Sequence, residues 1–195
     1  MGHAWVHAAI AAGAALSIAT AGALAADRYE IDPRHSFVEF SVDRFGFNRV
    51  IAGFSDVTGA LTLDEAAPEN SAVEARIGVA SLASGDAERD EHVTGARWLN
   101  AGAFPDISFR STSVTRTGEA TAEVAGELTL LGRTRPVMLS VRMNRIGPDP
   151  SNRRQAAGFS ATAVVKRSEF GLETAAALVG DDVEVRLEIL AHKTE

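Results

Sequence analysis

The 195-residue sequence contains no cysteine. This absence excludes a disulfide framework, a thiolate nucleophile and a metal site built on cysteine. The sequence also lacks a G-x-S-x-G nucleophile elbow, a G-x-G-x-x-G fingerprint and a Walker pattern, so it gives no support to serine hydrolase chemistry or nucleotide binding. Basic residues form no cluster, and the formal net charge is -7, which argues against a nucleic-acid partner.

Charged side chains are missing from residues 1–26, in contrast with the rest of the chain. An alanine-rich apolar run covers Ala8 to Leu24, and Ala23-Leu24-Ala25 forms a small-x-small pattern before the charged Asp27. These features predict a secretory signal peptide, 1–26, with cleavage near its end. An uncleaved anchor is the alternative, because the run is long enough to span a bilayer. Its high alanine and glycine content disfavours that alternative, and we treat 27–195 as one domain.

Residues 126–141 carry a clear strand signal. Apolar and polar residues alternate on both sides of a connection placed at 132–135, which predicts an antiparallel hairpin with one apolar face. Gly132 can adopt a positive φ in this connection, and Pro136 is expected at the start of the second strand. A hairpin alone is barely stable in water, so the rest of the chain must cover its apolar face.

The same period of two recurs along the mature chain. Further strands are expected within 29–33, 36–42, 50–63, 73–79, 107–109, 159–165 and 183–189. Residues 84–104 break the pattern and predict one or two short helices. Because no strand–helix alternation is present, the sequence predicts an all-β fold rather than a parallel sheet. A sandwich and a closed barrel both fit, and the long strands with internal glycines favour an antiparallel eight-stranded β-barrel.

The predicted inner face of this barrel is apolar, and we expect it to line a cavity. Its larger members are Val38, Phe40, Val42, Ile77, Val79, Ile107, Phe109, Leu128, Leu130, Leu139, Val141, Phe159, Val165, Leu187 and Ile189. The same face carries small residues, namely Gly59, Ala75, Gly126, Ala161 and Ala163. Small inward residues indicate either tight packing of a filled barrel or an open cavity. An apolar cavity with few polar groups would suit a lipid tail.

Six segments in order resemble a known family. They are Ile31–Phe40 (IDPRHSFVEF), Gly53-Phe54 with Gly59, Glu91-His92, Phe104–Phe109 (FPDISF), Gly126–Val137 (GELTLLGRTRPV) and Val165–Leu172 (VKRSEFGL). They are similar to the signatures of the YceI-like, polyisoprenoid-binding proteins, and the resemblance covers nearly all of residues 29–193. The sequence departs from the family pattern at Asn100, where an acid is common, and at Lys166, Glu169 and Leu172.

The resemblance implies an extended lipocalin-like barrel in a secreted, periplasmic bacterial protein. It implies that a long isoprenoid or related amphiphilic lipid binds in the barrel, often in a dimer, and it implies no catalytic activity and no cofactor. Homodimerisation and transient contact with a membrane surface follow as expectations about partners. Two alternatives stay open: an enzyme acting on a lipid headgroup in the same pocket, with His35 or His92 as base, and a filled-barrel structural or stress protein.

Four residues are candidates for the mouth of the cavity. Arg167 follows the inward positions of its strand, where it would either meet a headgroup or hold the turn at Phe170-Gly171 through an internal salt bridge. His35 would either cap a headgroup or fix a turn. Phe45 and Phe47 would form either a lip for lipid or a folded-back plug. No metal site is expected, because no histidines show zinc-like spacing.

Overall fold

The computed structural model describes residues 26–194, so the predicted signal peptide lies outside the described residues except for Ala26. The strands are β1 (Asp27–Ile31), β2 (Phe37–Arg44), β3 (Asn48–Phe54), β4 (Val57–Leu63), β5 (Ala72–Gly78), β6 (Leu82–Ala83), β7 (Asp106–Arg116), β8 (Thr121–Leu130), β9 (Arg133–Pro148), β10 (Gln155–Lys166) and β11 (Val179–Lys193). The helical elements are α1 (Ala87–Thr94) and three 3-10 turns, η1 (Pro68–Asn70), η2 (Val79–Ser81) and η3 (Arg167–Phe170).

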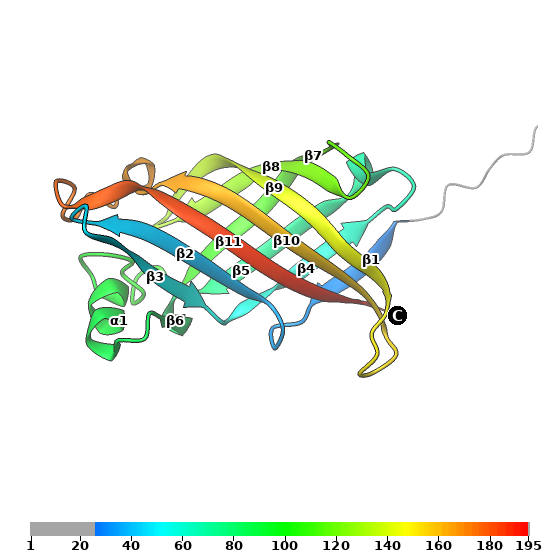
Figure 1. Ribbon diagram of the computed structural model, residues 1–195, viewed down its shortest axis with the longest axis horizontal. Coiled ribbons are helices and arrows are strands. Elements are labelled where there is room, and N and C mark those ends of the chain that lie inside the picture. Colours follow the sequence, from blue (N-terminus) through cyan, green and yellow to red (C-terminus); the bar gives the residue numbers. More distant parts are fainter. Residues whose placement is uncertain (1–25, 195) are drawn as a thin grey trace, which may run out of the picture.

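The strands form a closed antiparallel barrel. Its ring order is β1-β4-β5-β7-β8-β9-β10-β11, and β11 pairs back with β1. Strand β2 pairs with the same edge of β11 as β1 does, but along an earlier part of β11. Strand β3 pairs with β2, and the short β6 pairs with the end of β3. The prediction of an eight-stranded antiparallel barrel with one or two short helices is therefore confirmed (Figure 1).

Two details of the predicted strands are wrong. The expected strand 50–63 is two strands, β3 and β4, separated at Ser55-Asp56. The hairpin turn is only Leu131-Gly132, and both residues have positive φ (52° and 70°), as a two-residue type I′ turn requires. Pro136 consequently lies inside β9. It sits outside the Ser140–Pro148 stretch that pairs with β10, so its missing N–H breaks no ladder bond on that side.

The connections divide the barrel into two ends (Figure 1). The β2–β3 turn, the segment 79–105 with α1, the β8–β9 turn and the β10–β11 loop lie at one end, which we call the α1 end. The β4–β5, β7–β8 and β9–β10 connections lie at the other, together with the start of β1 and the end of β11. We call it the termini end.

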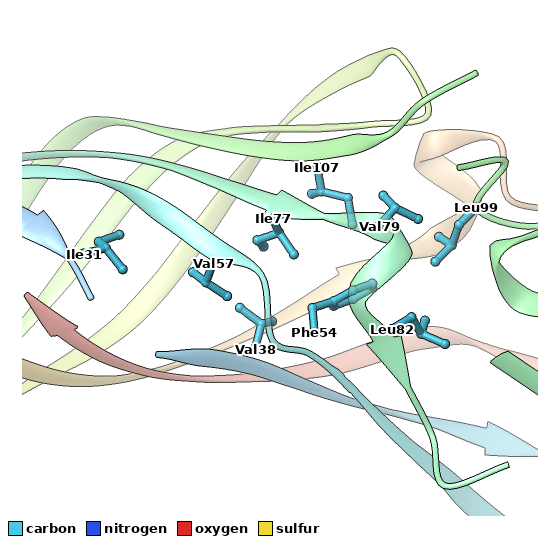
Figure 2. Packing of buried hydrophobic residues seen from close by; sticks show 9 residues of the cluster. All are labelled: Ile31, Val38, Phe54, Val57, Ile77, Val79, Leu82, Leu99 and Ile107. Carbon is cyan, nitrogen blue, oxygen red and sulfur yellow. The ribbon is translucent and has the colours of Figure 1, made fainter. Parts of the chain in front are cut away.

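The main apolar cluster lies inside the barrel against the β1–β7 half of the wall. Figure 2 shows side chains from these successive strands pointing toward one another across the interior. Its buried members are Ile31, Val38, Phe54, Val57, Ile77, Val79, Leu82, Leu99 and Ile107. The side chains of the opposite wall, β8 to β11, that pack against this cluster are partly buried, among them Leu128 and Leu187.

Candidate functional site: an apolar cavity through the barrel

The space inside the barrel is a cavity of about 940 Å³. Residues from both ends line it: Phe45 and Arg167 at the α1 end, and Asp64 and Glu119 at the termini end. Its wall between the ends consists almost entirely of aliphatic and aromatic side chains. A volume of this size lies in the range of protein ligand pockets, so the barrel is not filled by its own side chains.

The structure places nearly all of the predicted inner face on the wall of this cavity. The lining includes Val38, Phe40, Val42, Ile77, Ile107, Phe109, Leu128, Leu130, Leu139, Val141, Phe159, Val165, Leu187 and Ile189. That these side chains contact a ligand stays a prediction.

Val79 is the exception and requires a correction. Strand β5 ends at Gly78, and Val79 begins the 3-10 turn η2, so the period of two no longer sets its direction. Its side chain is completely buried in the main apolar cluster, outside the cavity lining. Its N–H donates to the carbonyl of Pro105 (2.8 Å), which ties the turn to the start of β7. Val79 therefore supports the wall rather than forming it.

The small inward residues serve both of the purposes that the sequence left open. A β-carbon on Gly126 would overlap the ring of Phe109, so this glycine permits tight packing between β7 and β8. Ala75, Ala161 and Ala163 instead lie on the cavity wall, where their short side chains leave the lumen open. Close packing and open volume thus occur at different places on the same inner face.

Arg167 is buried (4% exposed) at the α1 end and also lines the cavity. Its guanidinium donates to the carbonyls of Gly180 (2.8 Å, from Nε), Leu172 (2.6 Å), Thr174 (2.9 Å) and Val179 (2.8 Å). These bonds hold the β10–β11 loop, but through backbone carbonyls rather than the salt bridge that we considered. No carboxylate within residues 26–194 forms an ion pair with it.

His35 lies in the turn between β1 and β2, outside the cavity lining. Its Nδ1 is 2.9 Å from Oδ2 of Asp32, and the N–H of Arg34 donates to Oδ1 of the same carboxylate (2.9 Å). Burial alone would raise the pKa of Asp32, but the hydrogen bonds from His35 and Arg34 hold that pKa below its usual value. The geometry supports the turn-fixing role for His35, which is not among the residues that line the cavity.

Phe45 and Phe47 occupy the β2–β3 turn at the α1 end. Phe45 lines the cavity mouth, whereas Phe47 is 86% exposed and points away from the lumen. Neither side chain folds back as a plug in the lumen. His92, the other histidine that we considered as a base, lies at the cavity margin on α1, 6.0 Å from the ring of Trp98.

The sequence analysis missed the polar groups at the cavity ends. Asp43, Arg44, Asp86, Glu88 and Arg89 line the cavity at the α1 end. Asp64, Glu65, Arg116 and Glu119 line it at the termini end. These residues lie in or beside turns, where no periodicity tells which side chains point toward the lumen.

A second polar cluster, also missed, lies on the outer surface near the termini end. His192 is buried (5% exposed) on β11, with Nε2 2.9 Å from Oδ2 of Asp149 and Nδ1 3.8 Å from Oδ2 of Asp32. The hydrogen bonds from His192 and from Ser151 lower the pKa of Asp149 to about 2. This cluster fastens the β9–β10 loop to the barrel. The sequence does not reveal this cluster, because His192, Asp149 and Asp32 are far apart in the chain and form no motif.

Among residues 26–194, no group of three histidine, aspartate or glutamate side chains is placed to hold a metal ion. Within the same range, no helix has the length and apolar character needed to cross a membrane.

Comparison with known proteins identifies the family. The model of the YceI-like domain matches residues 29–191. A UPF0312 protein of Pseudomonas putida strain W619 is 39% identical over 168 residues, which cover 85% of this chain and 86% of that protein.

Solved structures share the fold. Burkholderia cenocepacia BcnA superposes with a TM-score of 0.74 at 22% identity, covering 82% of this chain and 98% of that one. A polyisoprenoid binding domain from Saccharophagus degradans, implicated in plant cell wall breakdown, gives 0.63 at 14% identity, covering 85% and 98%. At these identities the likeness concerns the fold alone. The family model and the Pseudomonas relative match at the level of sequence over most of the chain, and they show that the chain belongs to the YceI-like family.

Proposed function

We propose that this protein binds a long-chain isoprenoid or a related amphiphilic lipid inside the barrel and acts as a periplasmic carrier or sequestering protein. The observation that carries the proposal is the apolar cavity of about 940 Å³, whose lining reaches both ends of the barrel. The Saccharophagus domain of the same fold, which is described as polyisoprenoid binding, adds support. The barrel resembles binding proteins rather than enzymes, and His35, one of the two candidate bases, lies outside the cavity lining.

The wall chemistry suits such a ligand because apolar contact alone can supply the affinity. Each methylene transferred from water to an apolar wall contributes about 0.8 kcal/mol, so ten contribute about 8 kcal/mol before the cost of ordering the ligand. Phe40, Phe109 and Phe159 offer ring surface along the lumen for branched isoprene units. A ligand held this way needs few hydrogen bonds, in keeping with the scarcity of polar groups between the two ends.

The charges at the two ends favour one orientation of the ligand. Arg44, Arg89 and Arg167 line the α1 end. The three acids that share this end include Asp43 and Asp86, which accept hydrogen bonds from backbone N–H groups of Gly46 and Arg89. At the termini end, Arg116 is the one cation in the lining, and it is accompanied by Asp64, Glu65 and Glu119. An anionic or polar headgroup is therefore expected at the α1 end, with the hydrocarbon extending toward the termini end.

A single substitution can test occupancy of the lumen. Ala163 lies on the cavity wall, so Ala163→Trp would place an indole in the lumen. Thr162→Trp is the matched control, because Thr162 is exposed on the outer face of the same strand. Native mass spectrometry after incubation with a polyprenyl phosphate should show a bound lipid in the wild type and in the control, and at least tenfold less in Ala163→Trp. Equal retention in all three proteins, or no lipid in any, would contradict the proposal.

Export is tested separately. Amino-terminal sequencing of protein from a periplasmic extract should find a mature chain that starts at or next to Asp27. Full-length protein confined to the cytoplasm would overturn the carrier role in the periplasm while leaving lipid binding untouched. Size-exclusion chromatography of the same material addresses the expected homodimer.

A further inference from the structure

Three large apolar side chains are exposed together at the α1 end. Phe47 is 86% exposed, Leu178 56% and Phe45 42%. The N–H of Phe45 donates to the carbonyl of Leu178 (2.8 Å), so the β2–β3 turn and the β10–β11 loop are fastened side by side. Ala176 and Ala177, next to Leu178 in the loop, are exposed as well. We call Phe45, Phe47 and Leu178 the rim patch.

The rim patch is continuous with the cavity. Phe45 belongs both to the patch and to the cavity lining, and Ala175 of the neighbouring loop also lines the mouth. Phe45 has a φ of 61°, a left-handed conformation that is unfavourable for a bulky side chain, so a large apolar residue occupies this turn position at a cost in backbone energy. A lipid that leaves the lumen at this end would meet the rim patch first.

A cation accompanies the patch. The guanidinium of Arg44 lies over the ring of Phe45, 4.3 Å from its centroid, and it forms no ion pair with any residue in the described part of the chain. An arginine beside inserted aromatic side chains suits the level of lipid phosphates. Two exposed acids, Glu88 on α1 and Glu173 in the β10–β11 loop, lie at the same end of the barrel. Apolar contact rather than electrostatic attraction must therefore supply most of the binding.

The size of the patch distinguishes between occupants. Its three side chains expose on the order of 300–400 Å², given the size of aromatic side chains. A stable protein–protein interface buries roughly 800 Å² on each partner, so the patch is too small to hold a second copy by itself. A bilayer accepts single side chains, since each one inserts independently between headgroups. The other exposed large apolar residues among those described, Phe37, Ile51, Met138 and Val164, lie singly on four different strands of the barrel wall.

We propose that the rim patch docks on a lipid bilayer, with Phe45, Phe47 and Leu178 inserted at the boundary of headgroups and acyl chains and the mouth of the cavity opening toward the membrane. The proposal names the partner from which the site described above would take its ligand, and it rests on the proposed lipid binding. It also assigns the α1 end as the entrance and leaves the acidic termini end in water.

The absence of cysteine permits a direct test. Phe47→Cys and, as a matched control, Val164→Cys each introduce a single thiol, because Val164 is a similarly exposed apolar residue (61%) on the outer wall of β10. Each is labelled with a polarity-sensitive fluorophore and mixed with vesicles of phosphatidylethanolamine and phosphatidylglycerol. Emission should shift to the blue at position 47 and stay unchanged at position 164, also at high salt. No shift at 47, or equal shifts at both positions, would overturn the proposal.

Loss-of-function variants separate docking from ligand binding. Phe47→Ser/Leu178→Ser should lower vesicle affinity by about tenfold or more, since each substitution removes a large apolar contact. Because Phe47 and Leu178 are outside the cavity lining, retention of polyprenyl phosphate delivered from solvent should stay unchanged. The control Met138→Ser/Val164→Ser removes two exposed apolar side chains from the outer wall and should bind vesicles like the wild type.

The two proposals fail in different ways. A wild-type protein that holds no isoprenoid but still shifts its label at position 47 contradicts the ligand and supports docking. Vesicle binding that is equally weakened by both double variants contradicts docking at the rim patch. A sedimentation experiment in which Phe47→Ser converts a dimer to a monomer would likewise contradict it, because the patch would then be an interface between copies.

Discussion

The two ends of the barrel hold their loops with charges of opposite sign, a buried guanidinium at one end and a partly exposed carboxylate at the other. At the α1 end, the Arg167 guanidinium donates to carbonyls of the β10–β11 loop. At the termini end, the carboxylate of Asp149 accepts from Ser151 in its own loop and contacts His192 on β11. Among the described residues, the α1 end is where a loop of this kind lies beside a group of exposed apolar side chains, Phe45, Phe47 and Leu178. The comparison shows that side-chain anchors of opposite charge can hold loops at two ends whose exposed surfaces differ, one with an apolar patch and one without.

The largest expected effect concerns the α1 anchor. Arg167→Met removes the donor of four hydrogen bonds and leaves four partly buried carbonyls without this partner. We expect the free energy of unfolding, measured by urea denaturation, to fall by about 3–5 kcal/mol. Lipid retention by Arg167→Met should be measured as well. A variant that keeps its stability but loses its lipid would show that Arg167 contacts the headgroup rather than holding the loop.

The control for this substitution is the preceding residue. Lys166→Met removes an exposed ion pair with Asp182 (2.6 Å) and should change the free energy of unfolding far less than Arg167→Met does, because solvent screens this pair. If both substitutions cost the same, the buried anchor has no special role and the contrast between the ends is lost.

The termini end should respond to acid. Because the pKa of Asp149 is lowered to about 2, mainly by the hydrogen bond from His192, the anchor stabilises the folded state above the ordinary pKa of an aspartate, about 3.9. This contribution is lost as the pH falls from about 4 toward 2, when the carboxylate becomes protonated in the folded state. Amide hydrogen exchange of residues 149–154, corrected for its intrinsic pH dependence, should accelerate as the pH falls through this window. In Asp149→Asn the same amides should exchange rapidly at every pH tested.

The matched substitution at the α1 end is Asp181→Asn. The pKa of Asp181 is also lowered, chiefly by the backbone N–H of Ser168, so its removal should loosen the start of the β10–β11 loop and leave residues 149–154 protected. Acid-induced exchange at 149–154 that is the same in the wild type and in Asp149→Asn would contradict the assignment.

The smallest expected effect concerns Tyr29, near the termini end. Its side chain is completely buried, and within the described chain its hydroxyl has no hydrogen-bond partner. Burial, followed by the charges of Glu65 and Asp27, raises the pKa of this hydroxyl. Tyr29→Phe should therefore raise the free energy of unfolding by about 1 kcal/mol, since it removes an unpaired buried polar group. A loss of stability in thermal melts would show that the hydroxyl has a partner after all.

The interior of the site was predictable because strand geometry is strictly periodic. Phe159, Ala161 and Val165 share one parity in the sequence, and in a strand that parity fixes one face. The prediction failed where the period ends, at Val79, and where tertiary contacts interrupt a strand. The break between β3 and β4 is of the second kind, because Ser81 Oγ accepts from the N–H groups of Ser55 (3.2 Å) and Asp56 (3.0 Å).

The polar groups were predicted less well. Arg167 was a candidate for the cavity mouth, and it lines that mouth. Its partners are backbone carbonyls of the β10–β11 loop and of the start of β11, whose positions are set only when the loop has folded. The cluster of His192, Asp149 and Asp32 joins parts of the chain that are far apart in sequence. Such contacts leave no pattern in the local sequence, because the direction of a side chain in a turn depends on the turn conformation and not on the period of two that orders a strand.

The sequence by itself determined an antiparallel all-β fold, its apolar inner face and its family, and it favoured a barrel over a sandwich, because alternation, glycine positions and ordered motifs are properties of the linear chain. Only the tertiary structure decided that the barrel is hollow, that the two ends differ, and that Phe45, Phe47 and Leu178 gather at one mouth. The physical reason is that a lumen and a rim are made by residues distant in the chain, whose separation is fixed by strand pairing and barrel closure.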